Sequence, residues 1–363
     1  MILGRSISKL LLFLFIFFLI SCNKTPYETV ISGNTMGTSY TIKFSCNDGS
    51  FDSLDALSVE GEAYYLETVE NIKNDVDYIL NNLNNYFSTY MENSEISKIN
   101  NSKLFKIKIS EQFFYVLNKA LYYCILSNGL YDITVLPLTK LWGFLDYDDV
   151  IFPSELSIIS SKNNIGYKNI ETDFKKNTSN QGLENYYLIK QKPNINIDLN
   201  SIVKGHAVDV LYEYFLSHGY INFLIEIGGE IRTSSNDKKE WIVGVQHPLK
   251  NTLVKKIKLN NMSMATSGTY NNYFKKDNVV YSHIINPISG YPIEHKILSV
   301  TVISNNCIDA DAIATMLMLL DWQEGLELIN SDLFDTVECF IIVKDGEGFS
   351  EKYSDGFLDF IVN

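Results

Sequence analysis

The chain of 363 residues is short of cysteine, histidine and positive charge. Its five cysteines show no Cys-x-x-Cys spacing, which argues against a structural zinc site. With 30 Lys and Arg against 43 Asp and Glu, the formal net charge is −13, and so acidic a chain is not expected to bind nucleic acid. We find no internal repeat and no Pro-rich or Gly-rich linker. A single two-lobed α+β domain with mixed sheets and packed helices is therefore expected.

The N-terminus carries the one long apolar run. Arg5 and Lys9 precede an apolar stretch over residues 10–20, which is too short to span a bilayer comfortably and is typical of a signal peptide. The stretch ends in Leu19-Ile20-Ser21-Cys22, a pattern similar to bacterial lipoprotein processing sites, with Cys22 as the lipidated residue. An uncleaved membrane anchor is the alternative. We expect a signal peptide over 1–21, a tether over 22–30 and one exported, lipid-anchored domain over 31–363, facing the periplasm.

Local patterns predict the elements of this domain. Apolar residues recur at three and four positions in the helix that contains Val69, Ile72, Val76, Ile79, Leu83 and Phe87. Further helices are expected over 111–127, 203–218 and 309–330, and a short one ending near Ile99. Residues 45–64 and 137–161 are expected to lack regular structure. Strands are expected over 39–44, 195–199, 223–227, 240–246, 339–344 and 357–362. Cys124, between Tyr123 and Ile125, and Cys339, between Glu338 and Phe340, are expected to be buried thiols, with one or two disulfides as the alternative.

Two polar patterns indicate a site. Asp198 and Lys204 place a carboxylate and an ammonium on either side of a predicted strand-to-helix junction, and Asp311 and Thr315 lie four residues apart in a predicted helix. Residues at this spacing share a helix face, and their hard oxygen atoms suit Mg²⁺. Together the patterns predict a phosphate and divalent-cation site. The alternatives are a surface ion pair for the first pattern and a helix-terminal carboxylate beside a solvent-exposed threonine for the second.

A longer set of motifs resembles one family. Its members in chain order are Met36-Gly-Thr-Ser-Tyr40, Ser88-Thr-Tyr90, Ser94-Glu95-Ile96 with Asn100, Tyr131-Asp-Ile-Thr134, Trp142-Gly-Phe144, the 198–209 stretch, Gly228-Gly-Glu230, Thr266-Ser-Gly268, His283-Ile-Ile-Asn-Pro287 and Asp311-x-x-x-Thr315. This order is similar to that of the FAD:protein FMN transferases, the ApbE family. Each motif is weak alone, since Gly-Gly pairs and Thr-Ser-Gly turns are common.

The resemblance implies Mg²⁺-dependent transfer of the FMN half of FAD to a Ser or Thr hydroxyl of an exported protein, with release of AMP. The implied acceptors are flavin-bearing subunits of membrane redox complexes with an Asp-x-x-Ser/Thr-Gly-Ala-like motif. Two other functions stay open. One is an FAD pyrophosphatase in which water is the acceptor, and the other is a lipoprotein that binds FAD without turnover.

The resemblance also implies the site residues. The metal ligands would be Asp311, Thr315 and the main-chain carbonyl of Ser201, with Asp309 as a further acid nearby. The implied FAD contacts are Met36, Tyr90, Tyr131, Asp132, Asp198, Lys204 and the main chain of Ile285. Aromatic and thioether side chains suit a flat ring system, although Met36 and Tyr131 are equally typical of a core.

His283 is the candidate base. A Ser or Thr hydroxyl is a poor nucleophile until a group titrating near neutrality takes its proton. A structural histidine that bonds a loop carbonyl is the alternative. Asn286 stands where the resembled family usually has aspartate, which removes one partner for this histidine. The segment Thr266-Ser267-Gly268 would supply hydroxyl and N–H groups to phosphates, or would form a tight turn.

Overall fold

A computed structural model describes residues 28–45, 59–144, 152–176, 184–236, 239–269, 273–276, 279–294, 296–346 and 348–362. The predicted signal peptide and Cys22 lie outside the described residues, as does most of the predicted tether, whose last three residues belong to the first strand. None of the helices in these ranges combines the length and the apolar character needed to cross a bilayer.

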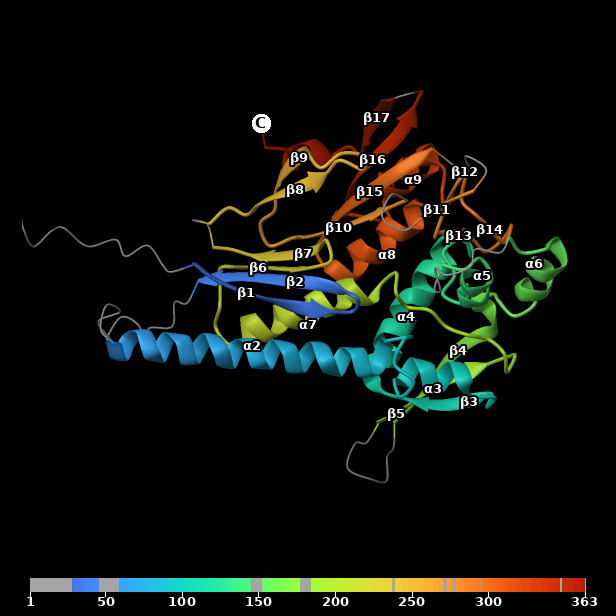
Figure 1. The fold of residues 1–363 in the computed structure, drawn as a ribbon, viewed down its shortest axis with the longest axis horizontal. Helices are drawn as coiled ribbons and strands as arrows, with labels where there is room; N and C mark the ends of the chain where they lie inside the picture. Colours follow the sequence, from blue (N-terminus) through green and yellow to red (C-terminus); the bar gives the residue numbers. More distant parts are fainter. Residues whose placement is uncertain are drawn as a thin grey trace, which may run out of the picture.

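An eight-stranded sheet forms the larger lobe (Figure 1). Every neighbouring pair in it is antiparallel. The strands in spatial order are β1 (Glu28–Thr35), β2 (Thr38–Ser45), β6 (Phe223–Ile227), β7 (Glu230–Ser234), β10 (Ser263–Gly268), β15 (Ile297–Ser304), β16 (Glu338–Asp345) and β17 (Gly348–Tyr353). We call this sheet and the elements that cover it the sheet lobe.

Two different layers cover the sheet. On one face, α7 (Val203–Ser217) and α8 (Cys307–Leu317) pack against the central strands, and the long α2 (Val59–Phe87) lies beside α7 and β1. On the other face lies a second apolar cluster that includes Trp241, Met264 and Phe340. This cluster is covered by the hairpin of β8 (Ile242–Gln246) and β9 (Leu253–Lys258) and by the 3₁₀ helix η2 (Phe357–Phe360). Helix α9 (Trp322–Ile329) packs on β16 from the first face, where its apolar side chains join the main core with α7 and α8.

The smaller lobe, which we call the helical lobe, occupies the other end of the molecule (Figure 1). It contains a three-stranded antiparallel sheet in the order β3, β5, β4. Its elements are α3 (Glu95–Asn101), β3 (Lys106–Ile109), α4 (Glu111–Leu126), α5 (Leu136–Leu141), α6 (Glu155–Lys162), η1 (Tyr167–Asn169), β4 (Ile170–Lys176), β5 (Glu184–Lys190), β11 (Tyr273–Lys276), β12 (Val279–Ser282), β13 (Ile285–Asn286) and β14 (Tyr291–Pro292). The predicted α+β class and two-lobed shape are confirmed. The expected mixed sheets are not found among the described residues, where every strand pair is antiparallel.

The helices predicted from apolar spacing and from capping residues, α2 and α4, are present in the structure. Ile72, Val76, Leu83 and Phe87 are buried along one face of α2, as the spacing predicts. Helix α4 begins where the Ser110 hydroxyl accepts from the Phe113 N–H, and positive-φ Gly129 follows its end. The elements α7, β2, β6, β8 and β16 also match their predicted ranges to within two residues.

The predicted strand over 195–199 is wrong, because these residues join no sheet. Their backbone groups bond elsewhere. The Ile197 N–H donates to Asn100 Oδ1 at 2.7 Å, and the Asp198 N–H donates to the Ile133 carbonyl at 2.7 Å. The segment is therefore extended but is held by a side chain and a loop.

Other predicted boundaries also fail. Residues 137–161 include all but the first residue of α5 and all but the last residue of α6. Pro137 does not prevent α5, because it stands in the first turn, where proline is tolerated. The predicted helix over 309–330 is two helices, because the Asp321 side chain caps a new one at the Gln323 N–H. Residues 357–360 form a 3₁₀ helix instead of a strand. The predicted loop over 45–64 is too long, because residue 45 belongs to β2 and residues 59–64 belong to α2. The strand expected to be the first is β2, and β1 precedes it.

Lys190 is fully buried at the end of β5. Its ammonium donates to the carbonyls of Ile99, Ser102, Pro193 and Ile195 at 2.8–3.4 Å. These contacts tie the segment before Asp198 to the C-terminal end of α3. Cys124, Cys307 and Cys339 are buried free thiols, which confirms the expectation for Cys124 and Cys339.

Candidate functional site

A cleft of about 390 Å³ lies where the two lobes meet. Of the predicted site residues in the described chain, all except Met36 and the additional acid Asp309 line it. Those that do are Tyr90, Tyr131, Asp132, Asp198, Ser201, Lys204, His283, Ile285, Asp311 and Thr315. Glu230, Thr266, Ser267 and Gly268 line the cleft as well. The fold thus gathers residues that are far apart in the sequence into one concave surface, as small-molecule sites require.

Lys204 stands at the start of α7 and forms an ion pair with Glu230 of β7. Burial alone would lower the pKa of the lysine, but the nearby carboxylates of Glu230 and Asp311 raise it, so the side chain is a fixed cation in the cleft. Such a group suits phosphate oxygens. The alternative of a surface ion pair between Lys204 and Asp198 is not made, because the carboxylate partner of Lys204 is Glu230.

Glu230 belongs to the Gly228-Gly-Glu230 motif, and its role becomes visible only in the structure. Its side chain is 2% exposed, and its Oε2 atom is buried with no hydrogen-bond partner among the described residues. Burial raises the pKa of Glu230, and the adjacent Lys204 ammonium acts in the opposite direction and favours the carboxylate. The Gly228-Gly229 pair before Glu230 is the feature of the sequence that could have indicated its role. Both glycines have positive φ and form the turn after β6, beside the cleft.

Asp311 and Thr315 lie on the face of α8 that borders the cleft. Asp311 is 3% exposed, and its Oδ2 accepts from the Gly205 N–H at 2.9 Å. The second oxygen, Oδ1, makes no hydrogen bond among the described residues. The Thr315 hydroxyl lies 3.1 Å from that of Ser267 in β10. Asp309 does not line this cleft; it bonds Lys119 and Tyr123 of α4 instead.

Tyr131 and Asp132 line the cleft from the segment between α4 and α5. The Tyr131 ring is 2% exposed and belongs to the core, and its hydroxyl lies 2.7 Å from that of Ser201. Both Asp132 oxygens accept hydrogen bonds within the protein, Oδ1 from Thr134 and Oδ2 from the Tyr167 N–H. Asp132 therefore shapes the wall of the cleft with its carboxylate already occupied.

Asp198 presents one oxygen to the cleft. Its Oδ1 accepts from the Asn200 N–H at 2.9 Å, which holds the turn into α7, and Oδ2 has no partner among the described residues. Burial raises the pKa of this carboxyl group. The position fits recognition of a hydroxyl or amino group.

Further lining residues come from the chain around β13 and from the end of α2. His283 lies two residues before β13, Ile285 is its first residue, and Tyr90, three residues after α2, is 75% exposed. The Asn286 side chain accepts from the N–H groups of Ile288 and Ser289, a turn-forming role that an aspartate could also fill. The Trp142 indole N–H donates to the Gly290 carbonyl at 2.9 Å, which ties this turn to α5.

Met36 is the predicted FAD contact that lies apart. It occupies the turn between β1 and β2 with a φ of 50°, and its side chain packs partly buried against the main core. It is absent from the lining of the cleft. A thioether carries no directional signal, so the sequence could not separate a core position from a ring contact.

Residues 36–341 match the model of the ApbE family. The chain belongs to the ApbE family. Relatives in this family include an FAD:protein FMN transferase from Vibrio cholerae, 31% identical over 94% of this chain and 96% of that protein. Another, from Haemophilus influenzae, is 30% identical over 93% of each chain.

Solved ApbE structures share the fold. The flavin transferase ApbE from Vibrio cholerae superposes with a TM-score of 0.75 at 30% identity, over 92% of this chain and 99% of that one. The ApbE protein from Thermotoga maritima gives a TM-score of 0.76 at 26% identity, over 93% and 100% of the two chains. The resemblance to this family expected from the motifs is confirmed.

Proposed function

We propose that this ApbE protein is an FAD:protein FMN transferase that moves the FMN part of FAD onto a Ser or Thr hydroxyl of an exported protein and releases AMP. One observation carries the proposal: Lys204, Asp311, Thr315 and His283 line a single cleft, together with Asp198. That set offers a fixed cation, metal-ligating oxygens and a base, which are the parts that phosphoryl transfer requires.

Mg²⁺ fits the oxygen atoms of this cleft. Among the described residues no group of three or more His, Cys, Asp or Glu side chains could hold a metal, so a cation here needs neutral oxygens too. Asp311 Oδ1, the Thr315 hydroxyl and the Ser201 carbonyl would supply hard oxygen donors, and substrate phosphates would complete the shell. The bound ion would neutralise charge that develops on the pyrophosphate.

Side chains of the cleft would bind the phosphates, recognise FAD and accept the proton. Lys204 would bind phosphate oxygens, held in place by Glu230, and Asp198 Oδ2 would accept from a donor group of FAD. His283 would take the proton of the acceptor hydroxyl as its oxygen bonds the FMN phosphorus. The bond from this phosphorus to the bridging oxygen would break, and that oxygen would leave with AMP.

The test uses the full chain in detergent with FAD and Mg²⁺, with and without an acceptor that carries the Asp-x-x-Ser/Thr-Gly-Ala-like motif. Nucleotides are separated chromatographically, and protein-bound flavin is detected by fluorescence in a denaturing gel. We expect AMP to form only with the acceptor and the acceptor band to fluoresce. Formation of FMN and AMP without acceptor would establish the pyrophosphatase instead, and intact FAD in both tubes would contradict both enzymes.

We also propose that the protein is exported and held to a bacterial membrane by lipid on Cys22, with its acceptors among periplasm-facing proteins of membrane redox complexes. The support is the sequence pattern of residues 5–22. Metabolic labelling with a radioactive fatty acid is expected to mark the wild-type protein and not Cys22→Ser. Equal labelling of both proteins would contradict the assignment.

A further inference from the structure

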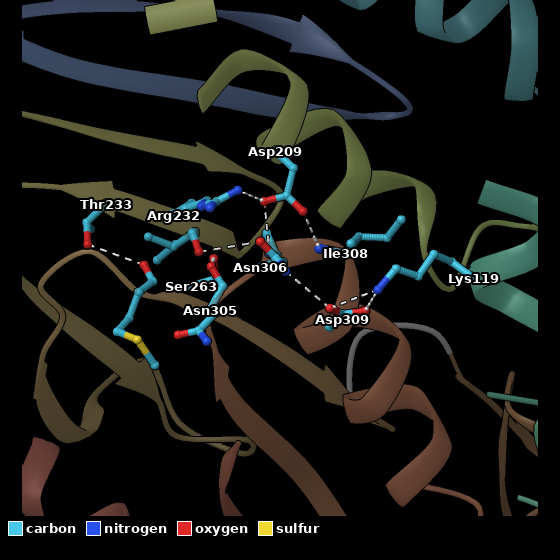
Figure 2. Close-up of polar contacts among 12 residues, drawn as sticks. Lys119, Asp209, Arg232, Thr233, Ser263, Asn305, Asn306, Ile308 and Asp309 are labelled. Atoms are coloured by element: carbon cyan, nitrogen blue, oxygen red, sulfur yellow. Dashed lines mark hydrogen bonds and ion pairs between the residues drawn. The ribbon is translucent and has the colours of Figure 1, made fainter. Parts of the chain in front are cut away.

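Helix α8 begins without a cap of its own. Asn306, the residue at its N-terminal boundary, makes no capping hydrogen bond through its side chain. Asp209 of α7 caps the helix instead: its Oδ1 accepts from the Cys307 N–H at 2.9 Å, and its Oδ2 accepts from the Ile308 N–H at 2.8 Å. Figure 2 shows Asp209 above the first turn of α8. Both carboxylate oxygens thus satisfy amides that a helix leaves unpaired.

Arg232 of β7 holds Asp209 in this position. Its Nη1 donates to Asp209 Oδ1 at 2.7 Å (Figure 2), and its guanidinium carbon lies 3.7 Å from the centroid of the Tyr212 ring. The side chains of Arg232 and Asp209 are 12% and 14% exposed. An ion pair with so little exposure and with stacking on one side has little freedom to turn.

Helices α7 and α8 hold each other by reciprocal hydrogen bonds from backbone N–H groups to carboxylates. Four residues before Asp209, the Gly205 N–H donates to Asp311 of α8, and Asp311 lies one turn after the amides that Asp209 caps. Each helix therefore gives a carboxylate to backbone N–H groups of the other. Two such contacts, one turn apart, fix the sliding position of α8 along α7.

We propose that Asp209 is a positioning residue for the metal site: by capping α8 it sets where Asp311 and Thr315 stand relative to Lys204. The inference rests on the proposed function, since it assumes that these residues act on a metal and a phosphate. Removing Asp209 leaves three features of the cleft unchanged, namely its ligands, its charge and the Lys204–Glu230 ion pair. It frees α8 to shift, which weakens a metal site that needs fixed ligand spacing.

A second cavity makes a direct test possible. It has a volume of about 380 Å³ and is lined by Asp209, Arg232 and Asn306, together with Glu111, Gln112, Tyr115, His206, Val210 and Glu213. This cavity borders the cap and shares no lining residue with the cleft. In Asp209→Ala, formate can therefore enter beside Arg232 and accept from the same two amides, without entering the FAD site.

The experiment uses the full chain in detergent. For Asp209→Ala we expect the Mg²⁺ concentration at half-maximal turnover to rise about 10- to 100-fold, the range for residues that support metal ligands. Mn²⁺ binding in the presence of FAD, followed by electron paramagnetic resonance, is expected to weaken in parallel. Sodium formate, but not sodium chloride, should restore both quantities toward wild type. Circular dichroism checks that the variant is folded, and Asp209→Asn replaces it if it is not.

Glu213→Gln is the matched control, because it removes a carboxylate from the same helix and the same cavity while leaving the α8 cap intact. It should keep the wild-type Mg²⁺ concentration at half-maximal turnover and the wild-type binding of Mn²⁺ in the presence of FAD. If wild type turns over FAD and the folded Asp209 variants keep its metal dependence, the inference is wrong and the proposed function stands. If formate fails to restore a weakened site, capping is not the cause and the inference is also wrong. A wild-type protein that binds no Mn²⁺ with FAD would contradict both.

Discussion

Gly205 and Asp311 touch where α7 crosses α8: the Gly205 N–H donates to Asp311 Oδ2 at 2.9 Å, and a Cβ on Gly205 would lie 2.8 Å from the Asp311 Cβ. The same Cβ would overlap the Cys307 carbonyl. A side chain at position 205 would thus push apart the two helices that form the wall of the cleft.

Gly205→Ala is therefore expected to lower the free energy of unfolding by about 1–3 kcal/mol, as overpacked cores do, and to reduce turnover as well. Chemical denaturation and the AMP assay measure the two effects. Gly348→Ala is the control, because its nearest neighbour would be an ordinary contact at 3.6 Å. Equal stability of the two variants would show that α8 yields to the added methyl group.

Asp311→Ala should reduce Mg²⁺-dependent turnover by about 100-fold or more, because charge stabilisation by a metal contributes several kcal/mol to the transition state. Asp309→Asn tests the neighbouring acid, whose partners are Lys119 and Tyr123. It should lower stability and keep metal-dependent turnover. A folded Asp311→Ala protein with full activity would show that the metal is held elsewhere.

His283→Gln should slow transfer to the acceptor by about 10²- to 10⁴-fold, the usual contribution of a general base, while FAD still binds. Single-turnover transfer and FAD titration by flavin fluorescence separate the two quantities. His218→Gln is a suitable control, since His218 ends α7 beside Tyr214 and does not line the cleft. Unchanged transfer in His283→Gln would assign this histidine a structural role.

His206 should make the protein less stable in acid. Burial lowers the pKa of its imidazole to about 4, below the ordinary 6.5 that applies in the unfolded chain. Above pH 6.5 both states are neutral and stability is unaffected; as pH falls from 6.5 to 4, the unfolded state binds the proton first. Up to about 3 kcal/mol is lost over this window.

Urea unfolding of wild type and His206→Leu between pH 7 and 4 measures this loss. The wild type should lose stability relative to the variant as the pH falls, because the leucine cannot titrate. A constant difference across the range would mean that His206 has the same pKa in both states.

The sequence predicted the parts of the structure that local rules determine. The period of apolar residues in α2 and the Ser110 cap of α4 are set by neighbours in the chain, so both helices were found. The motifs also identified most of the residues that line the cleft. Cys22 lies outside the described residues, so lipidation at this residue stays a prediction.

Pairings between distant segments could not be predicted. Lys204 bonds Glu230 and not Asp198, which is closer to it in the sequence. Asp209 caps a helix that begins almost a hundred residues later. Neither contact leaves a periodic signal, because each depends on how α7 lies against the sheet and against α8. The strand predicted over 195–199 is wrong for the same reason. Its apolar residues do alternate, but its backbone N–H groups bond to Asn100 and Ile133 and not to a neighbouring strand.

Lys190 has a consequence for how the cleft responds to its surroundings. Its ammonium sits among four carbonyl oxygens, an arrangement that in other proteins can coordinate a potassium or sodium ion. Here the positive charge is covalently part of the chain and cannot be diluted or exchanged. The segment that presents Asp198 is thus ordered by a cation of the chain itself, in a place where another protein would need a monovalent ion from the solvent.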